Sequence, residues 1–196
     1  MRRFLILALS LACLVGTGCG GVRFMAPGTA KIAAPAAGKA LVNVHRPSTM
    51  YGHGVDLIVW DGEKVIGNTH GRDLFQYECE PGRHVFHAKH LNVSVIVADL
   101  AAGGVYDLVT DCGPNFVPFQ PGYRLWLKEL PAGDSRRADI PKWESSETLL
   151  ALDPAQADKR AAYERREQAD VQKYLADFTT GSKQDKAGKI AASDKR

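Results

Sequence analysis

The chain has 196 residues, of which 45% are hydrophobic, with 25 Lys and Arg against 22 Asp and Glu. Residues 1–18 contain Arg2 and Arg3 but no acidic residue, so without them the chain carries 23 basic and 22 acidic side chains. Such a near-neutral protein lacks the clustered positive charge that general nucleic-acid binding requires. Nucleic acid is therefore excluded as an expected partner.

Residues 1–18 have the features of a lipoprotein signal peptide. Arg2 and Arg3 precede an apolar run over 4–15, and the small residues 16–18 lead to Cys19. The apolar run is shorter than the roughly 20 residues that span a bilayer. The segment resembles the bacterial lipobox, in which the cysteine becomes the diacylglyceryl-modified N-terminus of the mature protein. We therefore expect lipidation at Cys19, and the alternative is ordinary cleavage after Gly18 to a soluble secreted protein.

The residues after the signal peptide suggest in which membrane the protein is anchored and that a flexible tether follows the anchor. Gly20 rather than Asp follows the cysteine, which by resemblance to the known sorting preference favours a lipid-anchored, periplasm-facing protein of the outer membrane. Several acyl chains, at about 0.8 kcal/mol per buried methylene, make such an anchor effectively permanent. Residues 20–39 are rich in Ala, Gly and Pro without helix or strand periodicity. We expect residues 19–39 to be a flexible tether with a span of about 25 Å.

Residues 40–130 are predicted to form a mainly β domain, a small antiparallel β-sandwich or open barrel. Short alternating apolar runs are separated by turn signals such as Asp61-Gly62 and Pro81-Gly82. A two-residue turn at Pro81-Gly82 would place Cys79 opposite His84 in a hairpin, on an inward-facing side. The expected strands cover 40–45, 55–60, 65–66, 74–79, 84–90, 93–98, 105–112 and 123–130.

Two cysteines remain in the mature chain after Cys13 leaves with the signal and Cys19 is lipidated. Cys79 and Cys112 both have inward strand parity, and an oxidising compartment favours their pairing. We predict a Cys79–Cys112 disulfide, which would close a loop of about 33 residues and contribute roughly 3–4 kcal/mol. The alternatives are a metal site of both cysteines with His84, or a Cys79–His84 nucleophile and base.

The six histidines do not predict a metal site. On a strand His87 points away from His84 and His90, which then stand roughly 20 Å apart. A loose pairing of His53 with His70 is the remaining alternative. We expect no cofactor.

Four motifs carry a resemblance to a known family. In order they are V-N-V-H-R-P-S at 42–48, V-D-L-I-V-W-D-G-E-K-V-I-G at 55–67, P-G-R-H-V-F at 81–86 and G-G-V-Y at 103–106. Together with the lipobox they resemble a β-rich domain of unknown function in bacterial lipoproteins, itself similar to PEGA-type domains. The resemblance covers residues 40–112 and implies a β fold without an established reaction. Arg46-Pro47 would form the signature turn, where Pro47 ends the strand and Arg46 bonds carbonyls or an acidic partner.

The segment after Cys112 sets Phe116, Phe119 and Tyr123 among prolines. Uncharged aromatics in such a loop could stack on a peptide or sugar ring, so they are a candidate binding loop. The alternative is that they seal the open end of the β core.

The C-terminal third is predicted to contain one helix. Residues 131–152 are expected to be an irregular connector. Asp153-Pro154-Ala155-Gln156 has a capping residue, an early proline and a capping-box glutamine, which predicts an amphipathic helix over 153–178. Its apolar stripe either docks on the β domain or engages a partner. The polar, basic segment 179–196 is expected to be a disordered tail.

No residue pattern predicts an enzyme, because the chain lacks G-x-S-x-G, H-E-x-x-H, a Walker sequence and an evident acidic pair. We therefore expect a membrane-anchored envelope lipoprotein whose β domain is a non-enzymatic binding or assembly module. Its partner would be another envelope protein or a cell-wall polymer. The alternative is a periplasmic metal- or redox-linked protein that uses His and Cys.

Overall fold

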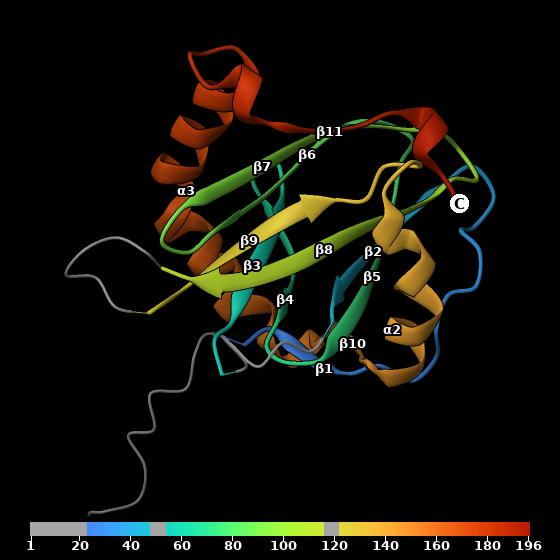
Figure 1. Cartoon of the computed structure of the whole chain (residues 1–196). Coiled ribbons are helices and arrows are strands. Elements are labelled where there is room, and N and C mark those ends of the chain that lie inside the picture. Colours follow the sequence, from blue (N-terminus) through green and yellow to red (C-terminus); the bar gives the residue numbers. More distant parts are fainter. Residues whose placement is uncertain (1–22, 48–53, 116–121) are drawn as a thin grey trace, which may run out of the picture.

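The computed structural model describes residues 23–47, 54–115 and 122–196. Two β-sheets lie face to face, and a long helix covers the outer side of one of them (Figure 1). Sheet A has the strand order β1-β10-β5-β2-β8-β9, and sheet B has the order β11-β7-β6-β3-β4. The predicted mainly β, sandwich-like fold with a C-terminal helix is confirmed.

Every strand expected between residues 40 and 130 has a counterpart, β2 to β9. The strands are β1 Met25–Pro27, β2 Ala40–Arg46, β3 Leu57–Asp61, β4 Lys64–Thr69, β5 Asp73–Cys79, β6 Gly82–Lys89, β7 Val93–Leu100, β8 Val105–Pro114, β9 Tyr123–Glu129, β10 Thr148–Leu152 and β11 Gly188–Ile190. The helices are α2 Ile140–Ser146 and α3 Ala157–Thr179, with short 3-10 turns η1 Ser135–Asp139, η2 Pro154–Gln156, η3 Gln184–Lys186 and η4 Ala192–Asp194.

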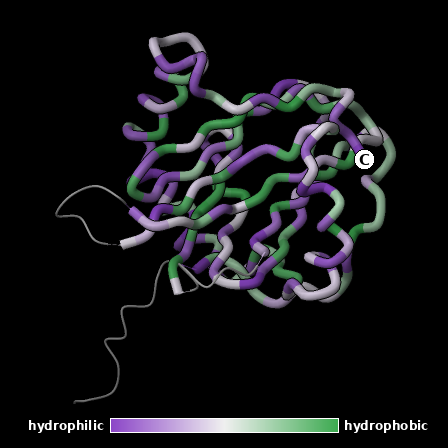
Figure 2. Tube along the Cα trace, viewed as in Figure 1, coloured by the Kyte–Doolittle hydropathy of each residue, from purple (hydrophilic) through white to green (hydrophobic). Residues whose placement is uncertain are grey.

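The core lies between the two sheets and follows the alternation of each strand. Val42 and Val44 of β2 are fully buried in it, as are Phe75 of β5 and Phe86 of β6. Figure 2 shows the hydrophobic stretches running along the strands. Burial of these side chains supplies the main driving force for folding.

The expected hairpin between β5 and β6 is wrong. β5 pairs with β2 and β10 in sheet A, whereas β6 pairs with β3 and β7 in sheet B. The turn before Gly82, whose φ of +125° suits glycine, therefore crosses from one sheet to the other. Tyr77 and Phe86 face each other across the core, with ring centroids 6.5 Å apart, and not along one strand ladder.

The described part of the expected tether is folded, so that prediction is wrong for residues 23–39. β1 pairs antiparallel with β10, and Phe24 is fully buried. Farther along, the amide N–H of Ile32 donates to Gln76 Oε1 at 2.6 Å and that of Ala36 to Glu78 Oε1 at 2.6 Å. Side chains of sheet A thus hold a segment that has no periodicity of its own.

Two further predictions in the C-terminal third are corrected. The expected irregular connector 131–152 contains α2 and β10, and β10 pairs in parallel with β5. The expected disordered tail 179–196 contains β11, which pairs in parallel with β7 and buries Ile190. A three-residue strand gains its stability from a distant partner, which a local pattern does not reveal.

Helix α3 docks on the outer face of sheet B, which resolves the two alternatives for its apolar stripe. Val171 is buried in a cluster with Phe24, Trp60 and Val65. The backbone N–H of Val65 on edge strand β4 donates to Glu164 Oε1 at 2.8 Å, so α3 also covers an otherwise open sheet edge. Among the helices of the described ranges, none combines the length and apolarity needed to cross a bilayer.

Candidate functional site

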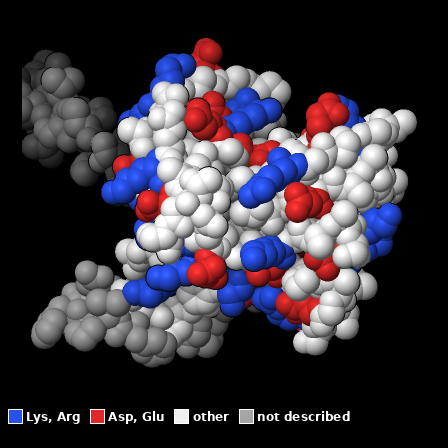
Figure 3. All heavy atoms as spheres, turned by 90° about the horizontal axis from the view of Figure 1, so that it is seen from above, with Lys and Arg blue, Asp and Glu red and all other residues white. Residues whose placement is uncertain are grey.

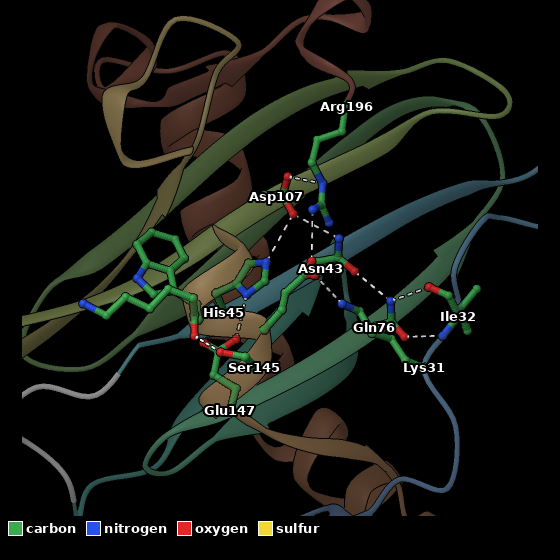
Figure 4. A network of polar contacts seen from close by, with 12 residues as sticks. Lys31, Ile32, Asn43, His45, Gln76, Asp107, Ser145, Glu147 and Arg196 are labelled. Atoms are coloured by element: carbon green, nitrogen blue, oxygen red, sulfur yellow. Dashed lines mark hydrogen bonds and ion pairs between the residues drawn. The ribbon is translucent and has the colours of Figure 1, made fainter. Parts of the chain in front are cut away.

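A cluster of buried polar side chains lies on the outer face of sheet A (Figure 4). Asn43 and His45 point away from the core because they alternate along β2 with Val42 and Val44. Asp107 of β8 lies beside them and is also on the outer face. These three polar residues are at most 1% exposed, so buried interactions must satisfy them.

His45 lies between two carboxylates. Its Nδ1 is 2.8 Å from Glu147 Oε2 and its Nε2 is 3.2 Å from Asp107 Oδ1. Because an ionised carboxylate only accepts hydrogen bonds, this arrangement favours the imidazolium form of His45, in which both ring nitrogens donate. Burial lowers the pKa of His45, but the hydrogen bonds to Asp107 and Glu147 outweigh it and raise the pKa above 6.5. The Trp143 ring of α2 covers this pair, 5.7 Å from the imidazole.

Asp107 joins His45 to the C-terminal segment. Asn43 Nδ2 donates to Asp107 Oδ1 at 3.0 Å, and Arg196 Nε lies 3.0 Å from Asp107 Oδ2. Among described residues Oδ2 accepts no hydrogen bond of regular geometry, so Arg196 acts on it as an ion-pair partner. Burial raises the pKa of Asp107, but hydrogen bonds from His45 and Asn43 and the Arg196 charge lower it overall.

Glu144 of α2 binds the same arginine and a lysine from the N-terminal segment. Its Oε1 is 3.0 Å from Arg196 Nη1, and its Oε2 is 2.6 Å from Lys31 Nζ. Burial raises the pKa of Glu144, but the hydrogen bonds from Lys31 and Arg196 lower it overall. Ion pairs at this one place therefore connect three segments that are far apart in sequence: the N-terminal segment, α2 and the C-terminal segment.

A pocket of about 500 Å³ opens beside this network, within the size range of small-molecule sites. The Gln76 amide closes one wall, since it accepts from the backbone N–H of Ile32 and donates to the Ile32 carbonyl at 2.9 Å and to Asn43 Oδ1 at 2.9 Å. The pocket thus combines amides, paired charges and apolar patches. Its lining residues are Lys31, Ile32, Ala33, Leu41, Asn43, Gln76, Val105, Glu144 and Arg196.

None of the described residues singled out from the sequence lines this pocket. Cys19, His53, Phe116 and Phe119 lie outside the described residues. Tyr123 begins β9 opposite Pro114, at the far end of β8 from the pocket, and is 41% exposed. Tyr123, the one described residue of the predicted aromatic loop, is therefore in a different place on the molecule from the pocket.

The predicted Cys79–Cys112 disulfide is wrong, because both cysteines are free. Cys79 lies opposite Ala40 of β2, whereas Cys112 lies three positions beyond Val109, which is opposite His45. Five positions along β2 and three along β8 correspond to about 26 Å, far beyond the roughly 4.4–6.8 Å between disulfide-linked Cα atoms. Strand parity put both thiols on the core side correctly, but it carries no information about position along a strand.

Cys79 lies beside His84, as the nucleophile-and-base alternative requires, but both ring nitrogens of His84 already have other hydrogen-bond partners. Its Nδ1 is 2.7 Å from Asp61 Oδ2 and its Nε2 is 2.9 Å from the Glu80 carbonyl oxygen. Both partners are acceptors, so both nitrogens donate and neither can take a proton. The hydrogen bond to Asp61, with a smaller one to Cys79, raises the pKa of His84 to about 10.

The other histidines are held separately. His87 points to the opposite face of β6 from His84, as predicted, and stacks on Trp60 with ring centroids 5.7 Å apart. His70 Nδ1 is 3.1 Å from Asp56 Oδ1. Across residues 23–47, 54–115 and 122–196, no group of three His, Cys, Asp or Glu side chains is placed to hold a metal ion.

Sequence reasoning missed the network residues Asn43, His45, Asp107, Glu147 and Arg196. The alternation along β2 does put Asn43 and His45 on the outer face, which predicts solvent exposure. Their burial depends on α2 and the C-terminal segment, whose positions no local pattern gives. A buried position for polar residues could be inferred only after those covering elements are placed.

The fold and the site together define a class of protein: a two-sheet β body, with an ion-paired pocket on the outer face of one sheet and a helix on that of the other. Comparison with known proteins found no matching family model, curated protein or solved structure.

Proposed function

We propose that the protein is an outer-membrane lipoprotein, anchored through acylated Cys19, whose β body is a non-enzymatic binding or assembly module facing the periplasm. The observation that carries the proposal is the 500 Å³ pocket on sheet A. It is walled by three chain segments that ion pairs hold together. Membership of the β-rich lipoprotein domains that residues 40–112 resemble is part of the proposal.

The chemistry of the pocket supports binding rather than turnover. Lys31, Glu144 and Arg196 each have an opposite charge within 3.0 Å. The Glu144 carboxylate is paired with Lys31 and Arg196, and His45, beside the pocket, donates from both ring nitrogens to carboxylates. A general base needs a free lone pair near the reacting proton. A pre-paired, rigid wall instead suits the recognition of a ligand whose groups complement it.

The composition of the pocket also suggests the kind of ligand. Ile32, Leu41 and Val105 offer apolar contact, while the amides of Asn43 and Gln76 add polarity. On the face shown in Figure 3, acidic and basic side chains are interspersed and neither sign dominates. A segment of another envelope protein, or a cell-wall polymer with amide and hydroxyl groups, matches this surface better than a strongly charged polymer does.

In-cell photo-crosslinking from the pocket rim tests the proposal. Ile32 lines the pocket and is 37% exposed, whereas Leu91, 54% exposed, does not line it and provides a matched control. A photoreactive amino acid at position 32 of the full chain, at native levels, should capture one specific partner that position 91 does not. Recovery of no specific partner, or of the same set from both positions, would contradict the binding role, provided that the protein is present in the membrane fraction.

A further inference from the structure

Phe24 is held firmly in the folded body, near the start of the described residues. Its side chain is fully buried, and its ring centroid is 5.5 Å from that of Tyr163 on α3. Its backbone N–H donates to Asn68 Oδ1 at 2.9 Å, and its carbonyl accepts from the backbone N–H of Asp153 at 2.9 Å. One residue is therefore held at once by β4, by the end of β10 and by the docked helix.

The chain between this clamp and Cys19 is short. Phe24 is five residues from Cys19, so the two Cα atoms can be at most about 18 Å apart. A folded body of this length has a radius of gyration of about 16 Å, and is thus roughly 40 Å across. The linker of residues 19–24, called the leash below, is shorter than the folded body is wide. It is also shorter than the 25 Å span expected for a flexible 20-residue tether.

We propose that acylated Cys19 holds the folded body directly against the membrane surface, through an anchor edge made of Arg23, Asp56, His70 and Arg72. This inference rests on the proposed lipid anchor. Acyl chains in the hydrocarbon keep the Cys19 backbone at headgroup depth, so the adjoining edge of the body lies on the headgroups. The occupant of this surface is the bilayer that holds the protein's own acyl chains.

The anchor edge is built around the point where the chain enters the body. Arg23 Nε lies 3.7 Å from Asp56 Oδ1, and His70 Nδ1 lies 3.1 Å from the same oxygen. The Arg23 side chain is 56% exposed, and Arg72, in the same turn as His70, is also exposed. Two exposed guanidinium groups at this edge can donate to lipid phosphates, which guanidinium geometry favours.

The pocket and the anchor edge lie at opposite ends of β2. Leu41, near the start of the strand, lines the pocket. Arg46, at its end, donates through Nη1 to the carbonyls of Val55 at 2.7 Å and Thr69 at 2.8 Å, which adjoin Asp56 and His70. Five strand positions separate the two ends by about 16 Å. The membrane therefore leaves the pocket open to a partner.

Photo-crosslinking to lipid in the full-length, membrane-extracted protein tests the orientation. A photoreactive amino acid at position 72 should give lipid adducts by mass spectrometry, whereas one at position 32, on the pocket rim, should not. Absence of lipid adducts from position 72, or equal yields from both positions, in protein whose Cys19 is acylated overturns the orientation and leaves the anchor intact. Unmodified Cys19 in the same sample overturns the anchor itself.

A longer leash gives a second test. Insertion of 20 Gly and Ser residues between Gly21 and Val22 lengthens the leash from five residues to 25. The effective concentration of the anchor edge at the lipid surface should fall about tenfold, and the position-72 adducts with it, while the amount of protein in the membrane fraction stays the same. Adducts that are undiminished by the insertion would overturn the claim that the short leash sets the contact.

Discussion

His45 Nε2 and Asp107 Oδ1 lie 3.2 Å apart on neighbouring parallel strands of sheet A, and both side chains are completely buried. Buried charges are tolerated only when they are paired and hydrogen-bonded. Here the cationic partners of Asp107 come from β2 and from the C-terminal residue of the chain, Arg196. The network therefore links the central strands β2 and β8 to the C-terminal segment of the chain.

Removal of the shared carboxylate should destabilise the protein strongly. Asp107→Asn leaves His45 with one carboxylate and Arg196 without its buried partner, and we expect a loss of about 3 kcal/mol in the free energy of unfolding. Denaturant unfolding at neutral pH measures it. Asp99→Asn, at an exposed position of β7, is the control and should change stability little. Equal stability of the two variants would show that the buried network contributes nothing.

His84 and His87 should titrate in opposite directions from the ordinary histidine pKa of 6.5. The hydrogen bond to Asp61 raises the pKa of His84 to about 10, whereas burial lowers that of His87. NMR titration of the two imidazoles measures both values. Titration of both rings near pH 6.5 would contradict both the hydrogen bond from His84 to Asp61 and the burial of His87.

The raised pKa of His84 also predicts how stability depends on pH. The protonated form is favoured by folding, so its contribution is complete below pH 6.5 and is lost as pH rises toward about 10. His84→Gln should lower stability at pH 6 and flatten the decline above pH 7 in unfolding experiments. A wild-type protein and a variant with parallel pH profiles would exclude His84 as the source of the decline.

Cys79 and Cys112 should remain unlinked in protein isolated from an oxidising compartment, because about eight strand positions separate them. Non-reducing peptide mapping should recover each cysteine in its own peptide, and reductant should leave the thermal midpoint unchanged. A cross-linked peptide that contains both residues would mean that the strand register of sheet A is different.

The C-terminal segment should behave as part of the folded body. Ile190 is buried on β11, and its neighbour Lys189 is exposed on the same strand. Ile190→Ala should cost about 2 kcal/mol and increase hydrogen exchange over 188–196, whereas Lys189→Ala should do neither. If the wild-type protein already exchanges over 188–196 as fast as an unfolded peptide, this segment is disordered, as the sequence predicted.

Strand alternation predicted the local structure well. The runs that became β2 and β5 alternate between two faces, and Val42, Val44 and Phe75 lie on the face that is in the core. The pattern could not show that β5 and β6 belong to different sheets, because parity assigns a face and not a pairing partner.

The elements that were missed depend on distant partners. β1, β10 and β11 are three to five residues long, and each pairs with a strand that lies far away in sequence. β1 and β11 have the composition of linkers, and β10 is an apolar run too short to show a clear period, so no local signal identifies these three segments as strands. The polar network has the same origin, since Glu147 and Arg196 reach His45 and Asp107 only after these segments are in place.

The lipid-anchored function depends above all on the chemistry of Cys19. Mass spectrometry of the N-terminal peptide, from protein extracted from the membranes of its native host, examines that residue directly. We predict a peptide that begins at Cys19 and carries a diacylglyceryl thioether. A peptide that begins at Cys19 with an unmodified thiol, or one that still contains residues 1–18, would contradict the proposed anchor and the membrane orientation that follows from it.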